Sequence, residues 1–407
     1  MTASVGVWLF GALGGLATTA IAGARAIARR LVSTTGLVTE TPGMEGLGLL
    51  PLSALRFGGH DVRRTTLLES AREIERTTGS IPAELVRALE DDLSAVSREI
   101  CQGTLAGCGS AILKLADPGL IAAEEQRTLR DSVQRLRHDL AAFRQRHGLS
   151  RLIAVNVAST EPPAEPHAAL ESLAALEDVI DRNDRNAVRA STLYAYAALQ
   201  EGAAYINFTP STAALPRSIQ QLGQEQGLPF MGSDGKSGET LVKSVLAPMF
   251  RYRNLEVLAW HGYNLLGDRD GLVLADPENR ASKIQSKDRV VSGILGYPVQ
   301  THVGIDFVES LNDMKTAWDF IHFRGFLGFK MAMHFIWAGC DAILAAPLLL
   351  DLVRFAELAL RVGESGPMSH LAAFFKNPLG VEVHNLHEQH EMLKAYVSRH
   401  RGGGGKS

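Results

Sequence analysis

The segment Gly232–Thr240 has the composition of a loop that holds an anionic oxygen group. Its sequence, Gly-Ser-Asp-Gly-Lys-Ser-Gly-Glu-Thr, places one lysine and several hydroxyl groups among glycines. Glycines let the backbone approach a phosphate and point successive N–H groups at it, and Lys236 adds positive charge. The loop is not a Walker motif, which would require a glycine where Phe230 stands. Taken alone, the pattern could equally belong to a solvated loop.

Two lysines, Lys283 and Lys287, are spaced so that they would share one face of a helix. Ammonium groups that cluster in a closed site lower one another's pKa toward the range in which they can transfer protons. On an ordinary surface the same spacing would mean little. The pair therefore indicates acid–base chemistry only if other parts of the chain bring it into a cavity.

A dinucleotide-binding turn is the first element expected to position such chemistry. Residues 5–23 run from an apolar strand through a glycine turn into a helix of small residues. Gly11 permits the tight turn, and Gly14 and Gly15 let a pyrophosphate approach the N-terminus of the helix. The spacing is GxxGxxA instead of GxGxxG, with Leu13 at the middle position, so the motif alone is weak. The alternative is a signal peptide or membrane span, which the missing basic leader and the interrupting glycines disfavour.

Strands and helices alternate along the first half of the chain. Apolar strands are predicted at 151–157 and 204–208, and each is followed by polar turn residues. Asp61 follows an apolar stretch at 46–55, either as the end of a strand placed for a ribose hydroxyl or in a plain turn. Residues 65–148 have the periodicity of amphipathic helices. This alternation predicts a doubly wound parallel sheet, whose ligands bind beyond the carboxyl ends of the strands.

The pattern changes after the glycine-rich loop. Strand-like runs at 255–260, 301–308 and 335–339 are separated by segments of helical character, which predicts a second, mixed sheet inserted into the first domain. The apolar run 342–358 is too charged to cross a membrane. We expect it to pack back on the first sheet.

The composition indicates a cytoplasmic protein that can bury a large core. Of 407 residues, 46% are hydrophobic and 21% charged, and the net charge is −3. Nothing is basic enough to predict a nucleic-acid partner, and no membrane partner is expected. Three cysteines without metal-binding spacing suit a reducing compartment. An anionic substrate would have to be attracted by local lysines.

Six motifs, in order and over nearly the whole length, give the chain a resemblance to the myo-inositol-1-phosphate synthase family in its shorter prokaryotic form. They are Gly232–Thr240, Tyr263–Gly271, Ser282–Lys287, Asn312–Lys315, Cys340–Pro347 and Phe375–Leu379. The resemblance implies an enzyme that converts D-glucose 6-phosphate to inositol phosphate with bound NAD, which oxidises C5 and later reduces it again. It also implies a homo-oligomer, a tetramer in this family.

The fold that the resemblance implies is α/β. A Rossmann-type doubly wound parallel sheet carries an inserted mixed α+β domain for catalysis and oligomerisation. Residues 1–240 are expected to form the first part of the NAD-binding domain, with a helical excursion at about 65–148. Residues 241–341 would form the inserted domain, 342–401 would return to the Rossmann domain, and 402–407 would be a disordered tail.

Four lysines match catalytic positions of the family. Lys283 is expected to handle the proton at the C5 oxygen, with Lys287 beside it on phosphate or substrate oxygens. Lys315 would stabilise the C5 oxyanion and enolate and Lys376 would polarise the C1 aldehyde, although these two roles could be exchanged. The residues expected to hold the substrate phosphate are Ser237, Gly238, Glu239 and Thr240.

The cofactor is expected to be NAD, because an acidic ribose partner such as Asp61 favours NAD over NADP. The expected cofactor contacts are Gly11, Gly14, Gly15, Asp61, Thr160, Thr209, Asp234, Asp270, Asp313 and Asp341.

Several positions depart from the family's pattern. Glu239 replaces a glutamine in the phosphate loop, where a carboxylate is unfavourable unless it is protonated, bridged by a cation or turned away. Asp268 and Ser159 stand where relatives have asparagine. These changes leave the reaction type intact but leave the substrate open, together with a divalent or monovalent cation shared by carboxylates and phosphate. The alternative function is therefore an NAD-dependent cyclase or oxidoreductase that acts on a different phosphosugar.

Overall fold

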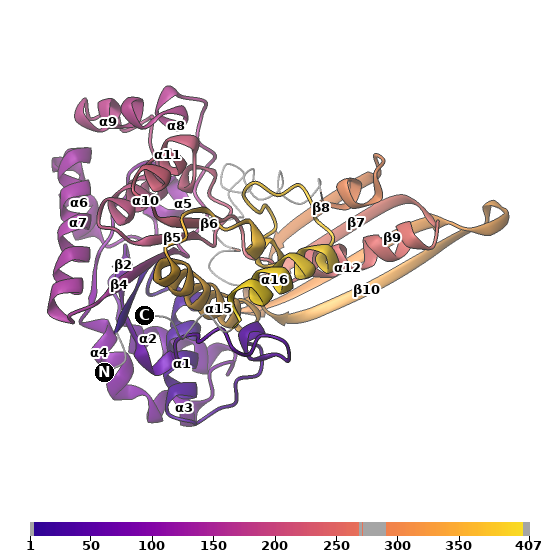
Figure 1. Cartoon of the computed structure of the whole chain (residues 1–407), viewed down its shortest axis with the longest axis horizontal. Helices are drawn as coiled ribbons and strands as arrows, with labels where there is room; N and C mark the ends of the chain where they lie inside the picture. The colour runs from indigo at the N-terminus through magenta and orange to yellow at the C-terminus, as the bar shows by residue number, and fades with distance from the viewer. Residues whose placement is uncertain (1–3, 268–270, 272–289, 402–407) are drawn as a thin grey trace.

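Two β-sheets organise the computed structural model, which describes residues 4–267, 271 and 290–401 (Figure 1). The larger sheet has seven parallel strands in the order β11-β6-β5-β4-β1-β2-β3. They are β1 (Val5–Phe10), β2 (Leu55–Asp61), β3 (Ile100–Gln102), β4 (Arg151–Asn156), β5 (Ala204–Asn207), β6 (Pro229–Gly232) and β11 (Gly366–Pro367). The order 3-2-1-4-5-6 within it is that of a Rossmann fold, so the predicted doubly wound sheet is confirmed.

The smaller sheet has four strands in the order β10-β9-β7-β8. They are β7 (Glu256–Leu266), β8 (Gln300–Phe307), β9 (Met314–Arg324) and β10 (Lys330–Cys340). Strand β7 pairs in parallel with β8 and antiparallel with β9, which makes the sheet mixed. In Figure 1 this sheet projects from the side of the first, ending in the tip between β9 and β10.

The α-helices of the described residues follow the strands along the chain. They are α1 (Gly15–Ala28), α2 (Leu67–Thr77), α3 (Ala83–Ala88), α4 (Glu90–Ser97), α5 (Ser110–Leu113), α6 (Pro118–Gln126), α7 (Leu129–Arg146), α8 (Ala168–Glu171), α9 (Leu173–Asp181), α10 (Ala190–Gln200), α11 (Arg217–Glu225), α12 (Glu239–Tyr252), α15 (Asp341–Val362) and α16 (Leu386–His400).

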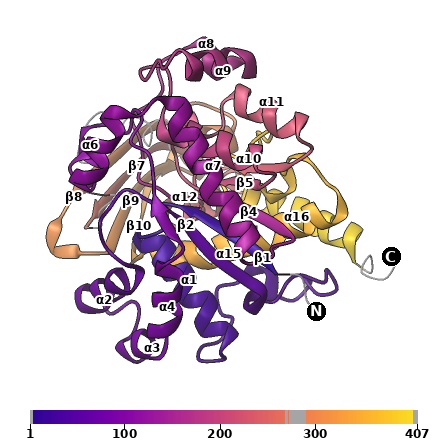
Figure 2. The same ribbon diagram turned by 90° about the vertical axis from the view of Figure 1, so that its left-hand side faces the viewer.

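Strand β1 shows why the large sheet has two cores. All six of its residues are buried, as expected of a central parallel strand. Because successive side chains point to opposite faces, Val7 and Leu9 join one core and Trp8 and Phe10 join the other. Helices α1, α2 and α15 cover the first face, and α7, α9, α10 and α11 cover the second (Figure 2). The apolar run 342–358 thus packs on the first sheet as expected, within α15.

Asp61 is the last residue of β2, so the strand end expected after the stretch 46–55 is confirmed, and the stretch itself is mostly irregular. Two other expectations need correction. The excursion at 65–148 contains helices but also β3, which pairs with β2 at the sheet edge. Between 308 and 335 the chain forms β9, so this part of the second sheet is a long antiparallel hairpin with β10 and has no separating α-helix.

Among the described residues, helices pack against one face of the small sheet. Trp260 and Ile321 point inward and pack with Phe250 of α12. Tyr263 and Trp318 lie on the opposite face, where their rings stack. Within the part of the chain that the structure describes, Trp318 and Ile336 of this second face remain exposed.

Candidate active site

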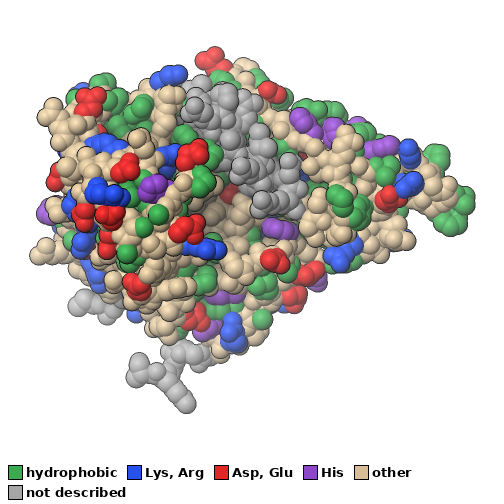
Figure 3. Space-filling model, turned by 90° about the horizontal axis from the view of Figure 1, so that it is seen from above, with side chains coloured by type: hydrophobic (Ala, Val, Ile, Leu, Met, Phe, Trp, Pro, Cys, Tyr) green, Lys and Arg blue, Asp and Glu red, His purple; other side chains and the backbone are tan. Residues whose placement is uncertain are grey.

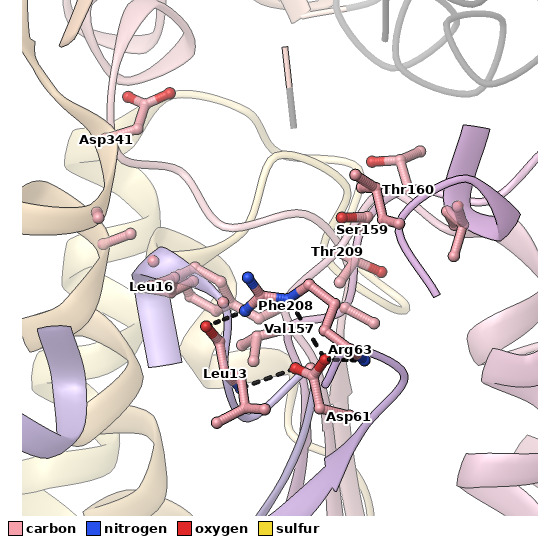
Figure 4. A pocket seen from close by; sticks show the side chains of 18 of the residues that line it. Leu13, Leu16, Asp61, Arg63, Val157, Ser159, Thr160, Phe208, Thr209 and Asp341 are labelled. Carbon is pink, nitrogen blue, oxygen red and sulfur yellow. Dashed lines mark hydrogen bonds and ion pairs between the residues drawn. The ribbon is translucent and has the colours of Figure 1, made fainter. Parts of the chain in front are cut away.

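A cavity of about 370 Å³ lies where four strands of the large sheet end. Gly11, Asp61, Val157 and Phe208 line it, and each of them follows or ends one of the strands β1, β2, β4 and β5. Figure 4 shows these strand ends together with Asp341, which comes from the start of α15. This is the carboxyl edge of a doubly wound sheet, where such folds bind their ligands.

The glycine turn after β1 shapes the base of the cavity. Gly11 adopts a φ of +89°, and a Cβ on it would lie 2.7 Å from the Cα of Ala158. No other residue type therefore fits this position. A Cβ on Gly15 would meet no atom within 4 Å, although Gly15 lines the cavity at the N-terminus of α1. The first N–H groups of a helix have no partner within the helix, so the space at the N-terminus of α1 suits a pyrophosphate.

Asp61 closes the turn from the neighbouring strand. Its carboxylate accepts hydrogen bonds from the backbone N–H of Leu13 at 2.8 Å and of Arg63 at 2.9 Å. The guanidinium of Arg63 donates to the carbonyl of Leu13 and lies 3.5 Å from Asp61 (Figure 4). Arg63 was not predicted from the sequence as a cavity residue, although it stands two residues after the ribose-binding candidate Asp61.

The ends of β4 and β5 are joined by a polar network. The side-chain amide of Asn156 donates to Asn207 and to Thr209, at 3.3 Å each, and the Thr209 hydroxyl donates to Asn207 at 2.9 Å. Thr160 and Thr209 both line the cavity and are buried. The two asparagines, which the sequence analysis did not single out, thus fix the orientation of one expected cofactor contact.

The glycine-rich loop reaches the same cavity from β6. Asp234 and Ser237 line it, and so does Lys376, which comes from the far end of the chain. The Lys376 ammonium lies 2.7 Å from the Asp234 carboxylate. Gly235 packs so closely on Phe208 that a Cβ would lie 2.2 Å from the ring. Glycine at this position therefore allows the loop to pack closely against the Phe208 ring.

Lys236 does not contribute its charge to the cavity as the sequence suggested. Its side chain is buried and does not line the cavity, and its ammonium donates to the side-chain carbonyl of Gln389 in α16. Burial lowers the pKa of Lys236 to about 7. This lysine links the loop to the C-terminal helix.

Glu239 is turned away from the cavity. It is the first residue of α12, is 2% exposed, and lies with one carboxylate oxygen 2.5 Å from the ammonium of Lys243. Its other oxygen accepts a hydrogen bond from the Asn264 amide at 2.6 Å. A carboxylate at this position was expected to be protonated, bridged by a cation or turned away, and the Glu239 side chain is turned away. Its backbone neighbours Gly238 and Thr240 remain at the N-terminus of the helix.

Lys315 enters the site from β9. Its ammonium lies 3.0 Å from the carboxylate of Asp341, and a Cβ on Gly238 would lie 3.5 Å from the same nitrogen. Asp341 and Asp313 line the cavity. The small sheet and α15 therefore bring a second lysine–carboxylate pair to the glycine-rich loop.

The structure brings together many but not all of the expected site residues. Gly11, Gly14, Gly15, Asp61, Thr160, Thr209, Asp234, Ser237, Asp313, Asp341 and Lys376 line one cavity, and Lys315 pairs with one of them. Lys283, Lys287 and Asp270, with the divergent Asp268, lie outside the described residues.

These residues fit NAD. The open space at Gly15 accommodates phosphate, the Asp61 carboxylate stands at the end of β2 where a ribose is bound, and the threonines lie farther along the sheet edge. For a metal ion, no group of three or more His, Cys, Asp or Glu side chains with suitable geometry occurs within the described ranges. In the same part of the chain, no helix is long and apolar enough to cross a membrane.

Comparison with known proteins agrees with this geometry. The model of the family described as myo-inositol-1-phosphate synthase, an NAD-binding family, matches residues 5–398. Inositol-3-phosphate synthase 1 of Bacteroides thetaiotaomicron is 33% identical and is covered over 94% of its length by 97% of this chain. Inositol-3-phosphate synthase of Saccharomyces cerevisiae is 30% identical over 60% of this chain and 48% of its own length.

Solved structures show the same fold at lower identity. Inositol-3-phosphate synthase from Caenorhabditis elegans superposes with a TM-score of 0.86 at 23% identity, over 98% of this chain and 86% of that one. A myo-inositol-1-phosphate synthase-related protein from Thermotoga maritima gives 0.77 at 24% identity, over 97% and 98%. The full-length family match and the relative at 33% identity place this chain in the myo-inositol-1-phosphate synthase family.

Proposed function

We propose that the protein converts D-glucose 6-phosphate to myo-inositol phosphate and regenerates its NAD within each turnover. The observation that carries the proposal is that one cavity joins the glycine turn and Asp61 to the phosphate loop and to Lys376. The expected dinucleotide site and the expected phosphate-binding site are therefore parts of one cavity. An ordinary dehydrogenase would need only one acid–base group beside its cofactor.

When bound, NAD supplies the acceptor for hydride from C5 and returns that hydride at the end of the reaction. The chain's own groups manage the charges and protons. Ser237, Gly238 and Thr240 would hold the substrate phosphate at the N-terminus of α12, where helical N–H groups favour an anion. This anchor would fix the sugar so that C5 and C6 lie within reach of the lysines.

Lys315 and Lys376 would stabilise negative charge on the reacting oxygens. After oxidation at C5, loss of a proton from C6 yields an enolate whose oxygen carries the charge, and Lys315 is assigned to that oxygen. Lys376 would polarise the C1 aldehyde, so that C6 attacks it and the ring closes. The two lysines could exchange these roles. Asp341 and Asp234 would keep their respective ammonium groups charged and oriented.

Lys283 and Lys287 complete the proposed catalytic set. Lys283 would remove and return the proton of the C5 hydroxyl, and Lys287 would contact phosphate or substrate oxygens. Lys283 must be neutral to take that proton. The ammonium groups of the other three lysines suit a reaction in which alkoxide and enolate charges develop in sequence.

The same experiment tests the function and its alternative. Purified protein is incubated with glucose 6-phosphate and a catalytic amount of NAD. Inositol phosphate is followed by mass and by phosphorus NMR, and absorbance reports net NADH. Product without net NADH supports the proposal. Absence of product with NAD still bound would favour the alternative, a cyclase or oxidoreductase for another phosphosugar.

We also propose a cation requirement, since phosphate oxygens beside Asp234 and Asp341 could share a divalent or monovalent ion. Both carboxylates already face lysines, which argues for a weakly held ion. Activity after exhaustive chelation, and after exchange of K⁺ for other monovalent ions, tests this point. Full activity in the absence of both would contradict it.

The proposed assembly is a homo-oligomer, with the tetramer expected from the family. Its support is the open face of the small sheet, where Trp318 is 40% and Ile336 72% exposed. Phe326 and Leu327, at the tip between β9 and β10, are 88% and 89% exposed. Figure 3 shows hydrophobic and histidine side chains gathered on this projecting part. Such an exposed apolar surface is typical of a protein interface.

We propose the domain division 1–240, 241–341 and 342–401. The first limit lies in the first turn of α12, between β6 of the large sheet and β7 of the small sheet, and the second lies at the start of α15. Helix α15 and strand β11 return to the first sheet, and the expected tail 402–407 lies outside the described residues. A cytoplasmic location is proposed because Cys101, Cys108 and Cys340 are all free thiols.

A further inference from the structure

A buried cluster of charged side chains lies beneath the phosphate loop. It consists of Glu239 and Lys243 from α12 and Asp319 from β9, which are 2%, 3% and 0% exposed. The Lys243 ammonium lies 2.5 Å from Glu239 and 3.7 Å from Asp319. The ammonium of Lys243 thus lies beside two buried carboxylates. Such a group is stable only if its geometry is well fixed.

The small sheet supplies further contacts to the cluster. The indole N–H of Trp260 donates to Asp319 at 2.7 Å, and the Asn264 amide donates to Glu239 at 2.6 Å. Gly262 stands between them on β7, and a Cβ there would lie 2.4 Å from a carboxylate oxygen of Glu239. The first turn of α12 is therefore attached to the small sheet by side chains of β7 and β9.

The other end of the loop is attached to the large sheet. The backbone N–H groups of Asp234 and Gly235 donate to the carbonyls of Thr209 and Phe208, which follow β5. The loop that would receive the substrate phosphate is thus held from both sheets, one at each end. Displacement of either attachment would change where its N–H groups point.

We infer that Glu239 is a positioning residue, which fixes the phosphate loop through Lys243 and Asn264 and does not itself contact the phosphate. This inference rests on the proposed function of the same loop. The carboxylate anchors the start of α12 to the small sheet, so that the N–H groups of residues 238–240 are aligned for the anion. In this chain the side chain at position 239 thus acts from the side of the loop that faces the small sheet.

The two possible roles of Glu239 predict opposite effects of Glu239→Gln. A carboxylate beside the phosphate would repel it, so its removal would lower the KM for glucose 6-phosphate. A positioning carboxylate accepts from two donors, Lys243 and Asn264, whereas the amide of glutamine offers only one acceptor oxygen. We therefore expect E239Q to raise KM about threefold while kcat changes less, since one hydrogen bond to the cluster is lost.

Lys243→Met provides the stronger test. It removes a buried ammonium that lies beside two buried carboxylates, and we expect KM to rise at least about tenfold. In the double variant E239Q/K243M the excess negative charge is reduced, so KM should fall back toward that of E239Q. Lys394→Met is the matched control, because Lys394 pairs with Glu391 on the exposed side of α16. Its KM should equal that of the unmodified protein.

Binding of inorganic phosphate and of glucose 6-phosphate to the NAD-loaded protein, followed by calorimetry, separates this inference from the proposed function. We expect the unmodified protein to bind most tightly, E239Q and the double variant less tightly, and K243M least tightly. If the affinities follow this order but no inositol phosphate forms, the proposed function fails and the positioning role stands. The inference is overturned if E239Q tightens phosphate binding, or if the double variant binds no better than K243M. Should K243M fail to fold, the sign of the E239Q effect still decides.

Discussion

The ammonium of Lys376 lies 2.7 Å from the carboxylate of Asp234, and the backbone N–H of Lys376 donates to the carbonyl of the same residue at 2.7 Å. One aspartate of the glycine-rich loop thus fixes both the backbone and the side chain of a lysine near the C-terminal end of the chain. The two side chains are 12% and 6% exposed. The lysine is therefore oriented at the cavity wall before substrate binds.

Lys376→Met should remove most of the activity without affecting cofactor binding. Loss of one oriented cation at a developing oxyanion typically lowers the rate by about 10² to 10³-fold. Asp234→Asn keeps a hydrogen-bond acceptor for the lysine and should lower kcat by only about tenfold. Single-turnover formation of inositol phosphate measures both effects, and NAD affinity serves as the control. A Lys376→Met protein with nearly normal kcat would exclude the lysine from the reaction.

The two glycines of the first turn should respond differently to alanine. In Gly11→Ala the new Cβ would press on the backbone of Ala158 at a φ of +89°, so we expect a loss of at least about 2 kcal/mol in the free energy of unfolding. In Gly15→Ala the Cβ meets open space, so the fold should keep its stability while NAD affinity falls. Denaturant titration and NAD titration of both variants test the contrast. Equal stability of the two would contradict it.

The sequence predicted the buried part of the fold well. The strand expected at 151–157 is β4 at Arg151–Asn156, and the one at 204–208 is β5 at Ala204–Asn207. Central parallel strands are apolar on both faces and need no tertiary information to be recognised. Strand β9 was missed because aromatic side chains occupy its outer face as well, so that the expected alternation of polar and apolar residues is absent.

Site residues that match a motif could be named from the sequence, but the directions of their side chains could not. Lys236 and Glu239 stand within the glycine-rich loop, yet each points to a partner distant in the sequence. The first contacts Gln389, and the second belongs to the cluster with Asp319. The residues next to Lys236 and Glu239 in the sequence do not indicate these distant partners. A motif therefore predicts which segment meets a ligand more reliably than which side chain does.

Lys236 should make stability depend on pH above neutrality. Its pKa is lowered to about 7 in the folded chain, from 10.5 when exposed, so the unfolded chain binds more protons between these values. The loss of folding free energy caused by burying the Lys236 ammonium is complete below pH 7 and decreases as the pH rises toward 10.5. Relative to that of Lys236→Met, the free energy of unfolding of the unmodified protein should therefore rise by on the order of 3 kcal/mol between pH 7 and 9.5.

Urea unfolding at several pH values measures this difference. Lys394→Met again provides the control, because that ammonium is about half exposed and its removal should shift the whole stability curve without changing its slope. Parallel curves for Lys236→Met and the unmodified protein would show that Lys236 stays charged, or is hydrated, in the folded state.

The open face of the small sheet should determine the oligomeric state. Ile336 of β10 lies opposite Trp318 of β9, and both side chains are on the uncovered face. In an assembly through this face, Ile336→Glu would bury a carboxylate without a partner, at a cost of several kcal/mol. We therefore expect a smaller species of normal thermal stability in light scattering at micromolar concentration. Val362→Glu, at an exposed apolar position on α15, is the control and should keep the original mass. If the unmodified protein is a monomer, or if Ile336→Glu leaves its mass unchanged, this face is not the interface, and its aromatic side chains require another explanation.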